Sequence, residues 1–188
     1  MSGRTLIKRY GKLLSICSKM LFLFPYGFRL GLFYFVRDIR GYFGVAIRYV
    51  IISTLSERIG NNVCIKEGVY IYNIRNLSVG DNVSIHPLCY IDALGGIGIG
   101  DNVSIAHNTS LISFDHTYSN KEMPIKYNPL KGDSIFIDND VWIGCGVRIL
   151  AGAKIGSRVI VGAGSIVKGV LESNSLYVGI PCKKVKTI

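Results

Sequence analysis

Large aliphatic residues recur every six positions through most of the chain after residue 58. The recurrence forms five blocks of three, and all fifteen positions hold Ile, Val or Leu: Ile59, Ile65, Ile71, Val79, Ile85, Ile91, Ile99, Ile105, Leu111, Ile137, Ile143, Ile149, Ile155, Val161 and Val167. Small or medium-sized residues follow four positions later wherever the repeat is uninterrupted. A strict period of six matches neither a helix nor the alternation of a long strand. The pattern predicts short strands joined by tight turns, with both sets of side chains pointing inward.

Gly, Asn and Asp stand between these positions and supply the turn conformations. Six residues then make one face, and three faces make a triangular coil. The repeat resembles the hexapeptide-repeat, left-handed parallel β-helix, a solenoid whose coils stack about 4.8 Å apart around an aliphatic column. The expected fold is mainly β, with about five coils and an N-terminal helical segment. A β-sandwich of many short strands is the alternative.

Three interruptions break the repeat, at residues 72–78, 92–98 and 112–136. Each follows the third face of a coil, so all three are expected to leave the solenoid at one corner and to stack there. The third is a loop of about 25 residues. Long loops inside compact domains are usually functional.

The first 58 residues lack the six-residue repeat and carry most of the net charge. They hold 10 Lys or Arg and 2 acidic residues, whereas the remaining 130 residues hold 12 and 10, so the formal charge of +10 is concentrated at this end. This localisation argues against a nucleic-acid partner. The charge-free apolar runs are too short to span a bilayer, and a secretory signal fits poorly. Five cysteines without a C-x-x-C spacing indicate reduced thiols and a cytoplasmic location.

The N-terminal segment, residues 1–58, is expected to begin with a basic amphipathic helix. Its predicted apolar face holds Leu6, Tyr10, Leu13, Leu14, Cys17, Leu21 and Phe24, and its other face holds Arg4, Lys8, Arg9, Lys12 and Lys19. A second helical stretch is expected over residues 28–56, after a break at Pro25 and Gly27. Two hypotheses follow: residues 1–24 contact an anionic membrane at the inner face of the cell, or the segment caps the open end of the solenoid.

The longest loop carries the candidate catalytic chemistry. It contains His116, whose imidazole has the pKa range suited to proton abstraction near neutral pH. Asp92 stands at the same corner one coil earlier, close to the base of this loop. His86 is a candidate for substrate contact, whereas His107 is expected to be a solvated corner residue. Because the three histidines are assigned to different phases, no metal site is expected.

Cys145 is an alternative candidate, as a nucleophile. Nucleophilic cysteines are activated by a neighbouring base. No histidine is assigned to the phase of Cys145, which disfavours this role.

The chain from residue 59 to residue 188 resembles the sugar O-acetyltransferases of the hexapeptide-repeat superfamily. The resemblance rests on IGDNVSIAHNTSLISFDH, on the loop with Pro124, on IDNDVWIGCGVRILAGAKIGSRVIVGAGSIVKGV and on VGIPCKKVK. It implies a β-helix acyltransferase domain over 59–172, with loop 112–136, and a C-terminal tail over 173–188. The chain is similar to galactoside and maltose acetyltransferases and to enzymes that modify bacterial surface polysaccharides.

The same resemblance implies site residues and partners. It makes His116 the general base and Asp92 an acceptor-binding carboxylate, with His86 near the point where galactoside-type relatives place an Asn. It also implies an acetyl-CoA site along one coil edge and in the tail, formed by Trp142, Gly144, Cys145, Ala163, Gly164, Lys168, Lys183 and Lys186. Enzymes of this type are usually homotrimers with sites between neighbouring subunits.

The implied reaction is direct transfer of acetyl from acetyl-CoA to a hydroxyl of a sugar or polysaccharide precursor, without a required metal. Three alternatives stay open. These are N-acetylation of an amino sugar nucleotide, O-acetylation of serine, and a scaffold without catalytic activity.

Overall fold

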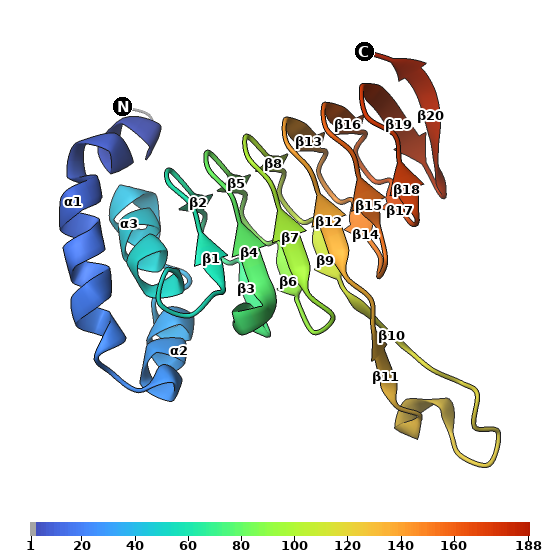
Figure 1. Cartoon of the computed structure of the whole chain (residues 1–188), viewed down its shortest axis with the longest axis horizontal. Coiled ribbons are helices and arrows are strands. Elements are labelled where there is room, and N and C mark those ends of the chain that lie inside the picture. Colours follow the sequence, from blue (N-terminus) through green and yellow to red (C-terminus); the bar gives the residue numbers. More distant parts are fainter. Residues whose placement is uncertain (1–2) are drawn as a thin grey trace.

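The computed structural model describes residues 3–188, with side chains described from Gly11 onward. Three helices at the N-terminus are followed by a β-helix (Figure 1). The helices are α1 (Gly3–Phe22), α2 (Tyr26–Phe35) and α3 (Gly41–Ile52). Among the described residues, no helix combines the length and hydropathy that crossing a bilayer requires.

The β-helix has three faces, which we call A, B and C. Face A contains β1 (Arg58–Ile59), β4 (Leu77–Val79), β7 (Ile97–Ile99), β12 (Ile135–Ile137), β15 (Lys154–Ile155) and β18 (Val170–Leu171). Face B contains β2 (Cys64–Ile65), β5 (Ser84–Ile85), β8 (Ser104–Ile105), β13 (Val141–Ile143), β16 (Val159–Val161), β19 (Ser175–Gly179) and β20 (Cys182–Thr187). Face C contains β3 (Tyr70–Tyr72), β6 (Tyr90–Asp92), β9 (Ser110–Ile112), β14 (Arg148–Ile149) and β17 (Ile166–Val167).

The pairing of the strands confirms the predicted β-helix. Within each block the first aliphatic residue lies on face A, the second on face B and the third on face C, and corresponding residues of successive coils pair in parallel. Fourteen of the fifteen are buried, and Ile59 at the helical end is half-buried. Burial of each such side chain stabilises the fold by about 1.5–3 kcal/mol, so the aliphatic column is the main source of stability.

Face A has six strands, so the solenoid has about six turns rather than the five expected. The sixth turn was not predicted because its first aliphatic residue does not follow the six-residue spacing. Ile155 pairs with Leu171, which follows Val167 by four residues instead of six. Only Lys168 and Gly169 separate β17 from β18, and Gly169 turns the chain with φ of 75°.

The helical segment closes one end of the β-helix. Phe33, Val36, Ile51 and Ile52 belong to the same apolar cluster as the first coils. Arg48 on α3 is fully buried. It donates hydrogen bonds to four carbonyl oxygens: Ile65 (3.0 Å), Val36 (3.3 Å), Arg37 (3.0 Å) and Ile39 (2.7 Å). Burial lowers the pKa of this guanidinium. Arg48 therefore joins the end of α2, the α2–α3 connection and the first coil.

The helices differ from the expected pattern in two ways. The stretch over 28–56 is two helices, with a break at residues 36–40, where Arg48 donates to the carbonyls of Val36, Arg37 and Ile39. On α1, Leu14 packs against Val50 of α3, with Leu21 beside them. Leu13, Cys17 and Phe24, expected on that same face, are exposed. The structure does not describe the side chains of the other residues assigned to the two faces of this helix, which are Leu6, Tyr10, Arg4, Lys8 and Arg9.

The C-terminal segment is a β-hairpin. β20 pairs antiparallel with β19 and extends face B. Tyr177 of β19 is buried, and its hydroxyl accepts a hydrogen bond from the Glu172 N–H at 2.9 Å. Lys184 forms an ion pair with Glu172 at 3.0 Å. The lysine-rich end is thus held against the last coil.

Candidate functional site

The three interruptions leave the β-helix at one corner, between faces C and A, as predicted. Tyr72, Asp92 and Ile112 end the face-C strands that precede them, and they are paired in register. Figure 1 shows the connections after β3, β6 and β9 emerging along the same edge. We call this edge the C–A corner.

The longest interruption forms an arm that projects from this corner. Its stem is the antiparallel pair β10 (Phe114–His116) and β11 (Leu130–Gly132), in which His116 lies opposite Leu130. The buried Asn128 holds the outer part. Its amide nitrogen donates to the carbonyls of Asn120 (3.2 Å), Met123 (3.4 Å) and Pro124 (3.3 Å). The arm is therefore held together by its own hydrogen bonds, and His116 lies on its stem with an exposed imidazole.

The base of the arm is clamped to the preceding interruption by Ser113, which is fully buried. Its hydroxyl donates to the Asp92 carbonyl at 2.8 Å and accepts from the Gly95 N–H at 2.9 Å. A side chain at Gly95 would place its Cβ 2.1 Å from the Ser113 carbonyl oxygen, so only glycine fits here. The sequence reasoning did not single out Ser113 or Gly95, although both lie at the interruptions that it identified.

Asp92 lies at this corner in a buried position, with 8% of its surface exposed. Its Oδ1 accepts hydrogen bonds from the Asn73 side-chain amide at 2.7 Å and from the Leu94 N–H at 3.2 Å. Asp92 is paired with Ile112 at the base of the arm, whereas His116 lies four residues further out. Asn73, from the first interruption, orients the carboxylate and was missed because no motif marks it.

A second group of predicted residues lies at the corner between faces B and C. The Gly164 N–H donates to the Cys145 carbonyl at 2.8 Å, which stacks Cys145 directly beneath the next coil. Ala163 and Gly164 are exposed, and Gly164 has open space around it with φ of 69°. Gly144 is buried, and a Cβ there would lie 2.6 Å from the Ala163 nitrogen, so coil stacking requires this glycine.

The three histidines occupy different positions of the coil, as expected, but the expectation that no histidine shares the phase of Cys145 is wrong. The Gly146 N–H donates to the His107 carbonyl at 3.0 Å, so His107 occupies the position of Cys145 one coil earlier. His86 lies one position earlier in its turn, because it aligns with Ala106 rather than with His107. Burial, and then the charges of Lys66 and His107, lower the pKa of His86. The 25-residue arm lies between His107 and Cys145 in the sequence, so the six-residue count did not show that the two residues share a position on successive coils. No group of three His, Cys, Asp or Glu side chains suited to a metal occurs within the described residues.

The remaining predicted donor-site residues lie either on face B or at the C–A corner. Trp142, Ile160, Leu176 and Lys186 are in register along face B, and Trp142 is 52% exposed. Lys168, expected on the coil edge of Ala163 and Gly164, instead follows β17 and lies at the C–A corner. Lys183 and Lys186 are exposed on β20.

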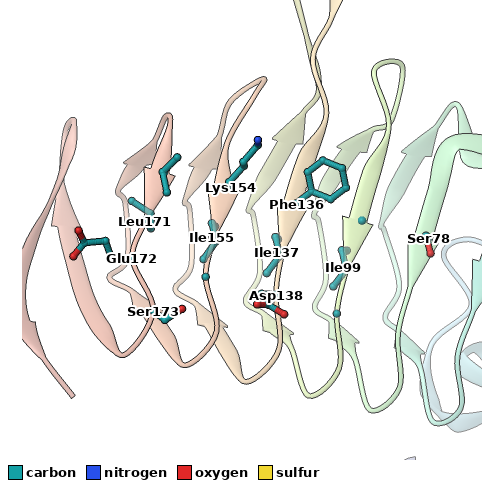
Figure 2. Close-up of a pocket in the computed structure, with 14 residues that line it drawn as sticks. Ser78, Ile99, Phe136, Ile137, Asp138, Lys154, Ile155, Leu171, Glu172 and Ser173 are labelled. Carbon is teal, nitrogen blue, oxygen red and sulfur yellow. The ribbon is translucent and has the colours of Figure 1, made fainter.

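A further hollow lies on the outside of face A. It has a volume of about 710 Å³ and is lined by Phe136, Lys154, Val170 and neighbouring residues (Figure 2). It contains none of the predicted site residues. Phe136 and Val170 are 53% and 71% exposed, so this face presents apolar side chains to its surroundings.

One chain therefore does not assemble all predicted groups in one place. His116 and Asp92 lie at the C–A corner, whereas Gly144, Cys145, Ala163 and Gly164 lie at the B–C corner, with face C between the two.

A parallel β-helix of six-residue repeats with a long arm at one corner defines a hexapeptide-repeat protein. The family described as "Bacterial transferase hexapeptide (six repeats)" matches residues 134–169. Galactoside O-acetyltransferase of Escherichia coli K12 is 32% identical over 141 residues, which cover 75% of this chain and 68% of that protein. The chain therefore belongs to the hexapeptide-repeat transferase family.

Two solved structures support this assignment. A galactoside acetyltransferase in complex with coenzyme A is 29% identical, with a TM-score of 0.77, and the match covers 86% of this chain and 80% of that one. AntD of Bacillus cereus, an N-acyltransferase in complex with dTDP and 3-hydroxybutyryl-CoA, is 28% identical, with a TM-score of 0.56, and the match covers 70% and 83%. Against several other curated acetyltransferases, the chain spans less than half of their length.

Proposed function

We propose that this protein transfers an acetyl group from acetyl-CoA to a hydroxyl group of a sugar or polysaccharide precursor. The observation that carries the proposal is the exposed imidazole of His116 on a rigid arm, at the corner where the buried carboxylate of Asp92 lies. Similarity to galactoside O-acetyltransferase over three quarters of the chain supports the same reaction.

In the proposed mechanism, His116 removes the proton of the acceptor hydroxyl as its oxygen attacks the thioester carbonyl. A backbone N–H stabilises the resulting oxyanion. The intermediate collapses with cleavage of the C–S bond, and the CoA thiolate takes the proton from His116. Transfer is direct, because the mechanism requires no covalent enzyme intermediate.

Asp92 and His86 are the proposed acceptor-binding side chains. Asp92 has one oxygen committed to Asn73 and Leu94, which fixes the orientation of its other oxygen toward a sugar hydroxyl. Burial, and then the charges of Lys66 and His107, lower the pKa of His86, which favours the neutral imidazole. A neutral imidazole can either donate or accept a hydrogen bond with a hydroxyl.

The proposed acetyl-CoA site uses the B–C corner and the C-terminal hairpin. The exposed backbone at Ala163 and Gly164 leaves room for the pantetheine arm, next to Gly144 and Cys145. Trp142 and Lys186 lie on one outward row of face B. The charges of Lys183 and Lys186 suit the nucleotide phosphates, whereas Lys168 lies at the C–A corner rather than at the B–C corner.

We further propose that the active unit is a homotrimer whose sites are shared between subunits. Because the two groups of residues lie at different corners of one chain, a neighbouring copy is needed to bring His116 to a donor site. The exposed apolar side chains of Phe136, Trp142 and Val170 are suited to such packing.

Complementation between two inactive variants tests this shared site. His116→Ala removes the base, and Ala163→Trp blocks the donor site at an exposed position. We expect each variant alone to be inactive and co-assembled mixtures to regain about a quarter of wild-type activity, because random assortment leaves one site in four with both groups intact. Mixing separately assembled oligomers is the control. Absence of recovery in co-assembled, light-scattering-verified trimers would place both groups in one chain.

The acceptor class is tested by thiol release from acetyl-CoA against a panel of sugars, oligosaccharides, amino sugar nucleotides and serine. We expect hydroxyl-bearing sugars to stimulate release at least tenfold over water. The similarity to AntD favours amino sugar nucleotides as the second candidate, and stimulation by these alone would replace O-transfer with N-transfer. Stimulation by serine alone would indicate serine O-acetylation. Failure to bind acetyl-CoA at all would indicate a scaffold.

A further inference from the structure

Helix α1 carries a second apolar stripe on the side that faces away from the protein. Its inner side is occupied by Leu14 and Ser18, and the Ser18 hydroxyl hydrogen-bonds to the Leu14 and Val50 carbonyls. The outer stripe consists of Leu13, Ile16 and Met20, which are 56%, 55% and 63% exposed, and their spacing of three and four residues places them on one face of the helix. Leu23, in the turn that follows α1, is 85% exposed.

The stripe continues into the α1–α2 turn. Phe24 and Phe28 are about half exposed, and their rings stack with centroids 5.2 Å apart. Phe43, at the start of α3, is 70% exposed. A group of exposed apolar side chains of this kind on α1 and in the turn that follows it indicates an interaction site rather than ordinary surface variation.

The charges around the stripe indicate the chemistry of its partner. Lys12 and Lys19 lie beside it on α1. Asp38 is the only acidic residue between positions 3 and 56, and it is paired with Arg37 at 3.1 Å. A second copy of this surface would bring lysines together without acidic partners. An anionic lipid surface supplies both negative headgroups for the lysines and an apolar layer for the stripe.

We propose that the outer face of α1, extended by Phe24 and Phe28, binds the surface of an anionic lipid bilayer. α1 runs across the end of the β-helix (Figure 1). A helix lying in the membrane plane would therefore point the long axis of the β-helix away from the bilayer. This inference does not depend on the proposed acetyl transfer.

The test is flotation of the full-length protein with vesicles of phosphatidylcholine, alone or with phosphatidylglycerol. We expect the wild type to float with the anionic vesicles and to be released by high salt. Ile16→Ser/Met20→Ser/Leu23→Ser and Lys12→Glu/Lys19→Glu should each lower the partition coefficient at least about tenfold. Matched controls are Ile180→Ser/Val185→Ser and Lys126→Glu/Lys131→Glu, which alter exposed residues of the C-terminal hairpin and the arm and should bind as the wild type does.

Three results would overturn the proposal. These are wild-type protein that stays unbound with anionic vesicles, α1 variants that float as well as the controls, and α1 variants whose molar mass by light scattering falls because the stripe is a subunit interface. Hydrogen exchange of the wild type supplies a measurement that needs no variant. The amides of α1 should gain protection with anionic vesicles, and unchanged exchange there would also contradict the proposal.

Discussion

Replacing His116 with alanine is expected to lower kcat for acetyl transfer by about 10²–10⁴-fold, the usual contribution of a positioned general base. KM for acetyl-CoA should change little, because the donor residues lie at another corner of the β-helix. The imidazole is exposed on the arm, so its loss removes no packing, and the melting temperature should stay near that of the wild type. The measurement is the rate of thiol release with a saturating sugar acceptor.

Cys145→Ser and His107→Ala are the matched controls for this experiment. The two residues occupy the same position on successive coils, an arrangement that could support a cysteine nucleophile. Direct transfer predicts that both variants keep most of the activity. If Cys145→Ser were inactive while His116→Ala retained near-wild-type rates, the mechanism would have to be rewritten around an acyl-cysteine.

Replacing Arg48 with alanine is expected to destabilise the protein by about 3 kcal/mol or more. The Ile65 and Ile39 carbonyls lose the donor that Arg48 supplies, whereas the Val36 and Arg37 carbonyls keep the N–H groups of Ile39 and Gly68. A buried polar group left without a partner costs about 1–3 kcal/mol. The loss should appear as a lower midpoint of urea unfolding followed by circular dichroism.

Two further variants separate hydrogen bonding from packing at this position. Arg48→Met keeps an apolar stem but removes every donor. It should therefore recover only a small part of the loss. Arg40→Ala changes an exposed arginine of the same connection and should shift stability by less than about 0.5 kcal/mol. A cost below 1 kcal/mol for Arg48→Ala would show that solvent or backbone shifts replace its contacts.

The six-residue pattern predicted the fold because it records burial directly. In a solenoid each coil contacts mainly its neighbours, so the residue that points inward is set within a few positions along the chain. Ile85, for example, pairs with Ile105, and Leu111 with Ile149, as the phase requires. The corner from which the arm projects followed from the same count.

The prediction of residue positions failed after segments that interrupt the six-residue repeat. The arm separates His107 from Cys145 in sequence, although they are adjacent in space. The short turn at Lys168 and Gly169 hid the sixth coil and moved Lys168 to the C–A corner. The length of an interruption does not by itself show at which position of the coil the repeat resumes.

The sequence by itself determined the three-faced β-helix, the stacked interruptions and the position of His116 on the longest of them. Only the tertiary structure decided that Asn73 orients Asp92, that Arg48 joins the helices to the first coil, and that α1 exposes a second apolar stripe. The physical reason is the range of the interactions. Burial in a repeat is periodic and local, whereas these contacts join segments whose separation along the chain follows no period.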